Sequence, residues 1–125
     1  MNEDLTLSIK KAESYLSNAQ VFVATSHPAG AITASYHCFF WLVRGLLADK
    51  DVFTKRHSAA REMFPLHFIR SGEIPTLFKD DFNFLFEHRQ IADYDVDGDF
   101  PLEEIEKCVT LAERFLTFVK TNYAS

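Results

Sequence analysis

The chain has 125 residues and a formal net charge of −5, and 47% of its residues are hydrophobic. This length supports one domain, residues 1–125, and the negative charge excludes a generally basic nucleic-acid-binding surface while leaving room for a local basic patch. No apolar run reaches the roughly 20 residues of a membrane span, and the acids near the start do not suit a signal peptide, so we expect a cytoplasmic protein without membrane contact.

The first part of the chain predicts two long helices separated by a proline. Apolar residues recur at helical spacing as one stripe, made by Leu5, Ile9, Ala12, Leu16, Ala19 and Val23. Pro28 interrupts this pattern, because it has no backbone donor and restricts the residue before it. The second helix, at about residues 28–48, is apolar nearly all round in SYHCFFWLVRGLL, which is typical of a helix packed on several sides.

The rest of the chain predicts three more helices. The stretch ADKDVFTKRHS is charged and aperiodic, which indicates a loop, and a shorter helix then runs from about Ser58 to IRSGEIP. There Gly72 suits a helix end and Pro75 a helix start. The fourth helix covers about residues 75–94, and the last begins near Pro101. The predicted fold class is therefore all-α, an antiparallel up-and-down helical bundle of four long helices plus a shorter helix.

Arg89 occupies the apolar stripe of the predicted fourth helix, between Leu85 and Ala92. A guanidinium in that place needs a partner, because burying an unpaired charge is costly. One interpretation is a structural ion pair with a nearby carboxylate such as Asp93, one turn later. The other is a contact with an anion or phosphate in a groove at the bundle surface or at a dimer seam. The sequence alone leaves both open.

The segment 55–70 carries a basic cluster with a single acid in it. As a solvated surface it needs no function, whereas as a phosphate-attracting patch it would suit RNA, a nucleotide or an acidic partner. The candidate nucleotide- or RNA-binding residues in it are Lys55, Arg56, His57 and Arg61.

Three stretches resemble motifs of the HEPN domain family (higher eukaryotes and prokaryotes nucleotide-binding), in its small stand-alone prokaryotic branch. TASYHCFFWLVRGLL is similar to the second-helix motif of that branch. KRHS followed by MFPLHFIRSGEIP resembles its His-Ser loop and Gly-Glu-Ile-Pro junction, and LFEHRQIADYD resembles its Arg-x-x-Ala-Asp-Tyr element. The resemblance implies an HEPN-like bundle that forms a homodimer and works with a minimal nucleotidyltransferase as its protein partner.

Several branches of that family are metal-independent ribonucleases acting as toxins, and the resemblance makes Arg89, Asp93 and Tyr94 the candidate catalytic residues. Those enzymes carry a histidine four to six residues after the arginine, but here Tyr94 stands in that place and no histidine follows position 88. A phenol titrates near pH ~10 and is a poor general base.

We therefore expect a non-catalytic or weakly catalytic module that binds a nucleotide, RNA or a partner protein. The resemblance implies that it belongs to a toxin–antitoxin-like or stress system with the nucleotidyltransferase. A metal-independent ribonuclease toxin and a purely structural helical scaffold are the alternatives.

The stretch DYDVDGDFPLEE, residues 93–104, has the spacing of a calcium-binding loop, with possible ligands and turn residue at Asp93, Asp95, Asp97, Gly98 and Glu104. Pro101 stands where such loops use a polar side chain or a water, and no second loop is present to pair with this one. Acids before a helix are also favoured by the helix dipole. We predict a solvated acidic connection, with no specific metal site and no cofactor.

Overall fold

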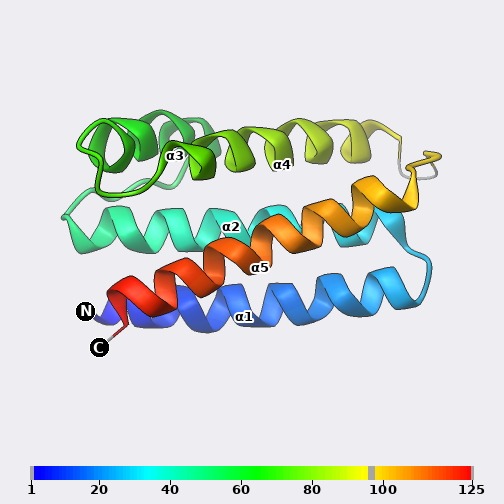
Figure 1. Cartoon of the computed structure of the whole chain (residues 1–125), viewed down its shortest axis with the longest axis horizontal. Helices are drawn as coiled ribbons and strands as arrows, with labels where there is room; N and C mark the ends of the chain where they lie inside the picture. Colours follow the sequence, from blue (N-terminus) through cyan, green and yellow to red (C-terminus); the bar gives the residue numbers. More distant parts are fainter. Residues whose placement is uncertain (1, 96–97, 125) are drawn as a thin grey trace.

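The computed structural model describes residues 2–95 and 98–124, and in these residues every regular element is helical. The elements are α1 (Glu3–Ala24), α2 (Pro28–Asp49), α3 (His57–Phe64), a π-helical turn (Pro65–Ile69), α4 (Thr76–Tyr94) and α5 (Leu102–Tyr123). The four long helices run alternately up and down, and both termini lie at the same end of the bundle (Figure 1). The predicted all-α antiparallel bundle is confirmed.

Helix α2 is the centre of the bundle and contacts α1, α4 and α5 (Figure 1). By length and composition it is the one described helix that could cross a membrane, but 78% of its most apolar window is buried inside the molecule. Its all-round apolar character is therefore explained by packing within one chain. Gly45 is required here, because a Cβ added to it would lie 2.5 Å from the Cβ of Ser8 on α1.

The core is built largely from stacked phenylalanines. The chain has 13 of them, and such rings bury a large apolar surface. The ring of Phe39 on α2 lies 4.0 Å from that of Phe115 on α5 and 5.0 Å from that of Phe82 on α4. Phe64 of α3 packs edge-on against Phe39, which attaches the short helix to the same core. Helices α2, α3, α4 and α5 thus contribute rings to one aromatic core.

The third predicted helix begins one residue earlier than expected and contains a π-helical turn. Pro65 is the first residue of this turn and has no backbone donor, so it cannot continue the hydrogen-bond pattern of α3. The Arg70 amide donates to the Pro65 carbonyl oxygen at 2.9 Å, five residues back, which is the π-helical pattern. Gly72 follows with φ of +79°, the left-handed conformation expected at a helix end.

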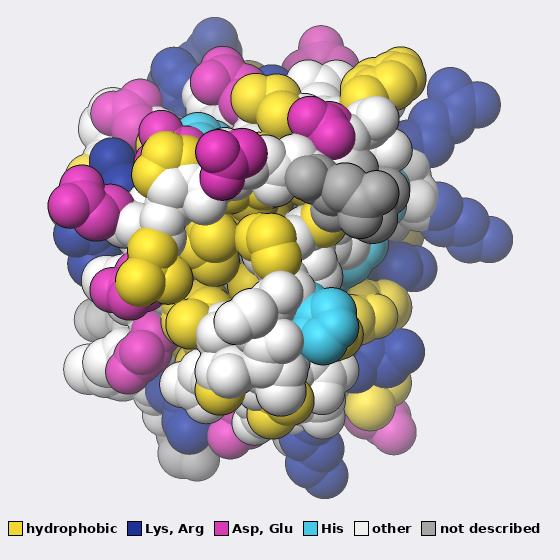
Figure 2. Space-filling view, turned by 90° about the vertical axis from the view of Figure 1, so that its right-hand side faces the viewer, with side chains coloured by type: hydrophobic (Ala, Val, Ile, Leu, Met, Phe, Trp, Pro, Cys, Tyr) yellow, Lys and Arg dark blue, Asp and Glu magenta, His cyan; other side chains and the backbone are white. Residues whose placement is uncertain are grey.

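Apolar side chains collect in a hollow at the end of the bundle opposite the termini, with acidic side chains on one side of it (Figure 2). Phe22 of α1, Pro28 of α2 and Phe100, before α5, line a cavity of about 300 Å³ there. The hollow lies at the opposite end of the bundle from α3, and no residue of the segment 55–70 lines the cavity (Figure 1).

Candidate functional site

Arg89 lies on α4 with only a quarter of its side chain exposed. Its Nε atom is 3.4 Å from a carboxylate oxygen of Asp93, one helical turn further on, so the ion pair expected from the spacing is present. This pair is loose, because the Asp93 side chain is half exposed and the buried Nε makes no hydrogen bond with any described residue. The charge of Arg89 is therefore only partly compensated within the chain.

His57, the first residue of α3, brings an imidazole to Arg89. Its Nδ1 atom lies 3.4 Å from Arg89 Nη1 and 2.8 Å from the Tyr36 hydroxyl oxygen on α2. A guanidinium can only donate, so this arrangement favours Nδ1 as an acceptor and the proton on Nε2. The ring also stacks on Phe40 at 4.0 Å. A histidine 32 residues before Arg89 thus stands beside it.

Burial and positive neighbours keep this histidine neutral. The pKa of His57 is lowered mainly by burial, and then by the charges of Arg89 and Arg44. The pKa of the nearby His37 is also lowered, mainly by burial and then by Arg89 and His57, while Asp93 opposes the shift. Burial raises the pKa of Tyr36 to about 12, so its hydroxyl stays protonated at neutral pH. The imidazole of His57 can therefore accept a proton at neutral pH.

Arg61 of α3 supplies a second guanidinium to this region. Its Cζ atom lies 3.5 Å from the centre of the Phe86 ring on α4, and its Nη2 donates a long hydrogen bond of 3.5 Å to Asn83. Its Nε is buried without a hydrogen-bond partner in the described residues, as is that of Arg89. The charges of Arg89 and Arg61 both lower the pKa of the Tyr36 hydroxyl, but burial raises it by more. We call Tyr36, His57, Arg61, Arg89 and Asp93 the Arg89 cluster.

The Arg89 cluster is flanked by an open groove of about 410 Å³. Small residues of α2, together with His37 and Asp93, are part of its lining. The groove gives an extended ligand, or a second protein chain, room to reach the cluster.

A comparison with protein families matches residues 5–122 to the HEPN domain. The chain belongs to the HEPN domain family. It is 29% identical over 117 residues to "Putative toxin MJ0142" of Methanocaldococcus jannaschii, a match that covers 94% of this chain and 80% of that protein. It is 28% identical to "Putative toxin MJ0605" of the same organism, over 96% of this chain and 89% of that protein. A third relative, "UPF0332 protein PH1297" of Pyrococcus horikoshii, is 30% identical over 61% of this chain and 54% of its own length.

The HEPN fold separates the predicted site residues into groups. Arg89, Asp93, His57 and Arg61 come together, whereas Tyr94 is 93% exposed and its phenol lies outside the Arg89 cluster. Lys55 lines a different pocket, described below, and Arg56 is exposed on the loop before α3. Tyr36 is not among the residues that the sequence patterns indicate. Its one signal is a phenol in an apolar helix, since buried tyrosine hydroxyls usually find a partner.

The acidic stretch of this HEPN domain is described only in part, because Asp97 lies outside the described residues. Glu104, at the last position of the predicted loop, lies on α5 with its carboxylate 3.5 Å from His88 Nε2 on α4. Among the described residues, no group of three His, Cys, Asp or Glu side chains could hold a metal ion. The absence of a specific calcium site stays a prediction, and a calorimetric titration of chelator-treated protein that gave one-to-one binding at micromolar calcium would contradict it.

Proposed function

We propose that this HEPN domain is a toxin-like RNA-binding protein whose Arg89 cluster binds a phosphodiester group. The observation that carries this proposal is Arg89 itself, a mostly buried guanidinium whose Nε has only a loose ion pair with Asp93 and makes no hydrogen bond within the described residues. A guanidinium offers donors in a fixed fork that matches two phosphate oxygens. The names of two relatives, which contain the word toxin, support the biological role.

His57 favours a second candidate function, metal-independent cleavage of RNA. Once Arg89 donates to a phosphate, Nδ1 of His57 can donate to the Tyr36 oxygen, which leaves the Nε2 lone pair free. That nitrogen could then remove the proton of a ribose 2′-hydroxyl. The 2′-oxygen would form a bond to phosphorus, and the bond from phosphorus to the 5′-oxygen would break, with water protonating the leaving oxygen. The histidine expected shortly after the arginine would in this case be replaced by one from α3.

The partner part of the proposal rests on the family resemblance. A minimal nucleotidyltransferase encoded beside this HEPN domain would be its protein partner, and the exposed Arg56 and Lys55 could contact an acidic surface or a nucleotide on it. Co-purification of the two proteins tests this directly. Recovery of the HEPN domain alone from cells that express both would count against the partnership.

The homodimer also stays a proposal, and it now rests on the groove beside Asp93. An apolar helix such as residues 28–48 can form a dimer seam, but here it is mostly covered by helices of the same chain. The groove beside Asp93, with Gly30 and Ala34 of α2 in its lining, is the described surface where a second copy could approach the Arg89 cluster. Light scattering at micromolar concentration distinguishes a dimer from a monomer.

The decisive experiment incubates the protein with single-stranded RNA in the presence of a chelator. We expect RNA binding by the wild type and its loss in Arg89→Ala, with Arg114→Lys as a control that removes a guanidinium elsewhere and keeps a cation beside Asp81. Cleavage that His57→Gln reduces by about 10²-fold or more, while binding remains, would establish the ribonuclease. Binding without cleavage supports the non-catalytic module. Absence of both would leave the structural scaffold as the better account.

A further inference from the structure

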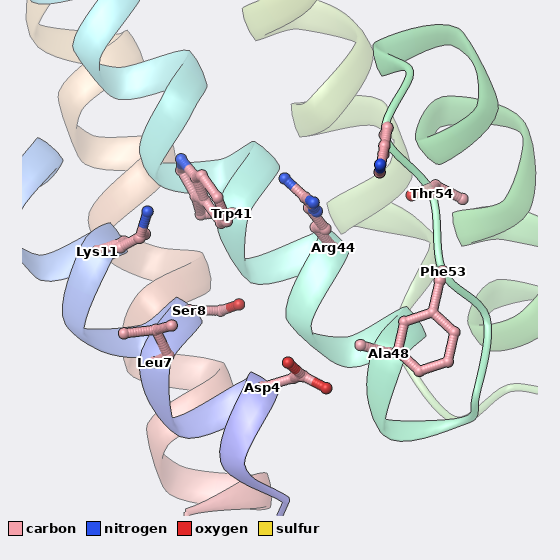
Figure 3. A pocket seen from close by; sticks show the side chains of 10 residues that line it. Asp4, Leu7, Ser8, Lys11, Trp41, Arg44, Ala48, Phe53 and Thr54 are labelled. Carbon is pink, nitrogen blue, oxygen red and sulfur yellow. The ribbon is translucent and has the colours of Figure 1, made fainter.

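A second pocket, separate from the Arg89 cluster, lies between α1, α2 and the loop of residues 50–56 (Figure 3). Its volume is about 340 Å³, and its lining includes Lys11, Trp41, Arg44, Phe53, Thr54 and Lys55. Sites for small ligands have volumes of roughly 300–1,000 Å³ and combine apolar walls with a few polar groups. We call it the Trp41 pocket.

The Trp41 pocket carries a local excess of positive charge on an acidic protein. Three cations from three segments line it against one acid, Asp4. Lys11 Nζ lies 4.2 Å and Arg44 Cζ 4.8 Å from the centre of the Trp41 ring, and Figure 3 shows the two side chains flanking it. Cation–π contacts position these groups without neutralising them. Since neither they nor Lys55 pairs with an acid in the described part of the chain, an anionic ligand would be favoured here.

Of two neighbouring residues, one indicates what else the ligand must contain. Phe53 lines the pocket with its side chain 71% exposed, which leaves an aromatic ring free to stack with a flat group. Thr54 is 9% exposed, and its Oγ1 has no hydrogen-bond partner among the described residues. Because that oxygen is buried, it does not contact the ligand, and the contacts to a phosphate fall to the three cations. An anionic phosphate beside a flat ring is the chemistry of a nucleotide.

The Trp41 pocket and the Arg89 cluster are neighbours along α2. The Phe40 ring connects them, since its centre lies 4.0 Å from that of His57 and 6.3 Å from that of Trp41. Lys55 is only two residues before His57 in the chain. A flexible polyanion bound at the cluster could therefore extend into the pocket, as single strands do along a groove with cations and aromatic rings.

We propose that the Trp41 pocket is a binding site for single-stranded RNA, which holds a nucleotide adjacent to the phosphodiester at Arg89. Lys11, Arg44 and Lys55 bind its phosphate, and Phe53 stacks on its base. This inference rests on the proposed function of the Arg89 cluster for the identity of the ligand.

The test uses the fact that Trp41 is the single tryptophan of the chain. A six-nucleotide single-stranded RNA should change Trp41 fluorescence as it binds to the whole protein. Removal of one stacking ring or one phosphate contact should weaken binding by about 5–10-fold, so we expect this from Phe53→Ala and from Lys11→Ala. Lys10→Ala is the matched control, because Lys10 is the preceding residue of α1, is exposed and does not line the pocket.

The outcomes separate this inference from the proposed function. RNA binding that needs Arg89 but is equal in Lys11→Ala, Phe53→Ala and Lys10→Ala would overturn the Trp41 pocket and leave the function intact. Fluorescence quenching by RNA that survives in Arg89→Ala and is lost in Lys11→Ala would support the pocket and overturn the role of Arg89. Displacement of the RNA by a six-residue polyglutamate peptide at equal concentration would show a site for acidic proteins, and would also overturn the proposal.

Discussion

Two arginine–carboxylate pairs on this bundle have opposite arrangements. In the pair between α5 and α4, the carboxylate of Asp81 is buried, with 12% of its side chain exposed, and half-exposed Arg114 donates to it at 2.6 Å. In the pair on α4, Arg89 is the buried member, and the half-exposed Asp93 lies 3.4 Å from it. Arg114 thus satisfies a buried acid, whereas the mostly buried Arg89 has a donor, Nε, that makes no hydrogen bond in the described part of the chain.

The difference supports the proposal that Arg114–Asp81 is a structural tie and that Arg89 binds a ligand. The Arg114–Asp81 pair joins two helices. Its short charge-assisted hydrogen bond is strong, so a further ligand would have to compete with it. The Arg89–Asp93 pair lies within α4 and does not connect two helices. Buried charge is costly unless it is paired and hydrogen-bonded, so a protein that retains Arg89 beside the neutral His57 has a centre that an anion would stabilise.

The largest expected effect is on RNA affinity. Arg89→Lys should weaken binding of the RNA hexamer by about 10-fold or more, because an ammonium cannot reproduce a bidentate contact with phosphate. Arg114→Lys should leave the affinity within about twofold, although it removes a guanidinium from the same protein. Fluorescence anisotropy with labelled hexamer measures both. Equal losses in the two variants would mean that Arg89 acts only through net charge.

Stability should respond in the reverse order. Arg114→Ala leaves the carboxylate of Asp81 buried without its partner and should lower the free energy of unfolding by about 1–3 kcal/mol. Arg89→Ala should change it by less than about 1 kcal/mol, because the substitution removes a desolvated charge along with a loose pair. Urea titration followed by far-UV circular dichroism gives both values. A larger loss in Arg89→Ala would make that arginine structural.

The pH dependence of stability reports on His57. Its pKa in the folded state is lowered, so between that value and its ordinary value near 6.5 the unfolded chain binds more protons than the folded one. The contribution of neutral His57 is therefore present above pH ~6.5 and is lost as the pH falls towards the folded pKa.

We expect the free energy of unfolding to decrease from pH 7 to pH 5, and to decrease less in His57→Gln. Arg89 and Arg44 favour the neutral form of this imidazole, and the neighbouring His37, whose pKa is also lowered, is present in both proteins. Urea titrations across this pH range supply the slopes. Equal slopes in the two proteins would show that His57 is not held neutral by its surroundings.

Local features of this molecule could be predicted from sequence because local rules govern them. The apolar stripe of α1, the left-handed Gly72 and the ion pair of Arg89 with Asp93 each depend on residues within a few positions of one another. The contact of His57 with Arg89 spans 32 residues and three elements, and helical periodicity does not say which sides of two helices meet. The motif resemblance made Arg89 a catalytic candidate, whereas His57 was a candidate for nucleotide or RNA binding from the basic segment 55–70.

The smallest expected effect concerns Asp93, the acid that competes with a ligand for Arg89. Its carboxylate is half exposed and lies 3.4 Å from Nε, so solvent already weakens the pair, which is worth roughly 0.2–1 kcal/mol in exposed cases. Asp93→Asn should therefore tighten RNA binding by about two- to fivefold at low salt, and less at high salt. Asp95→Asn is the matched control, because it removes the same charge from an exposed residue just past α4. Equal gains in the two variants would reduce the effect to net charge, and weaker binding in Asp93→Asn would mean that this acid orients Arg89 for the ligand.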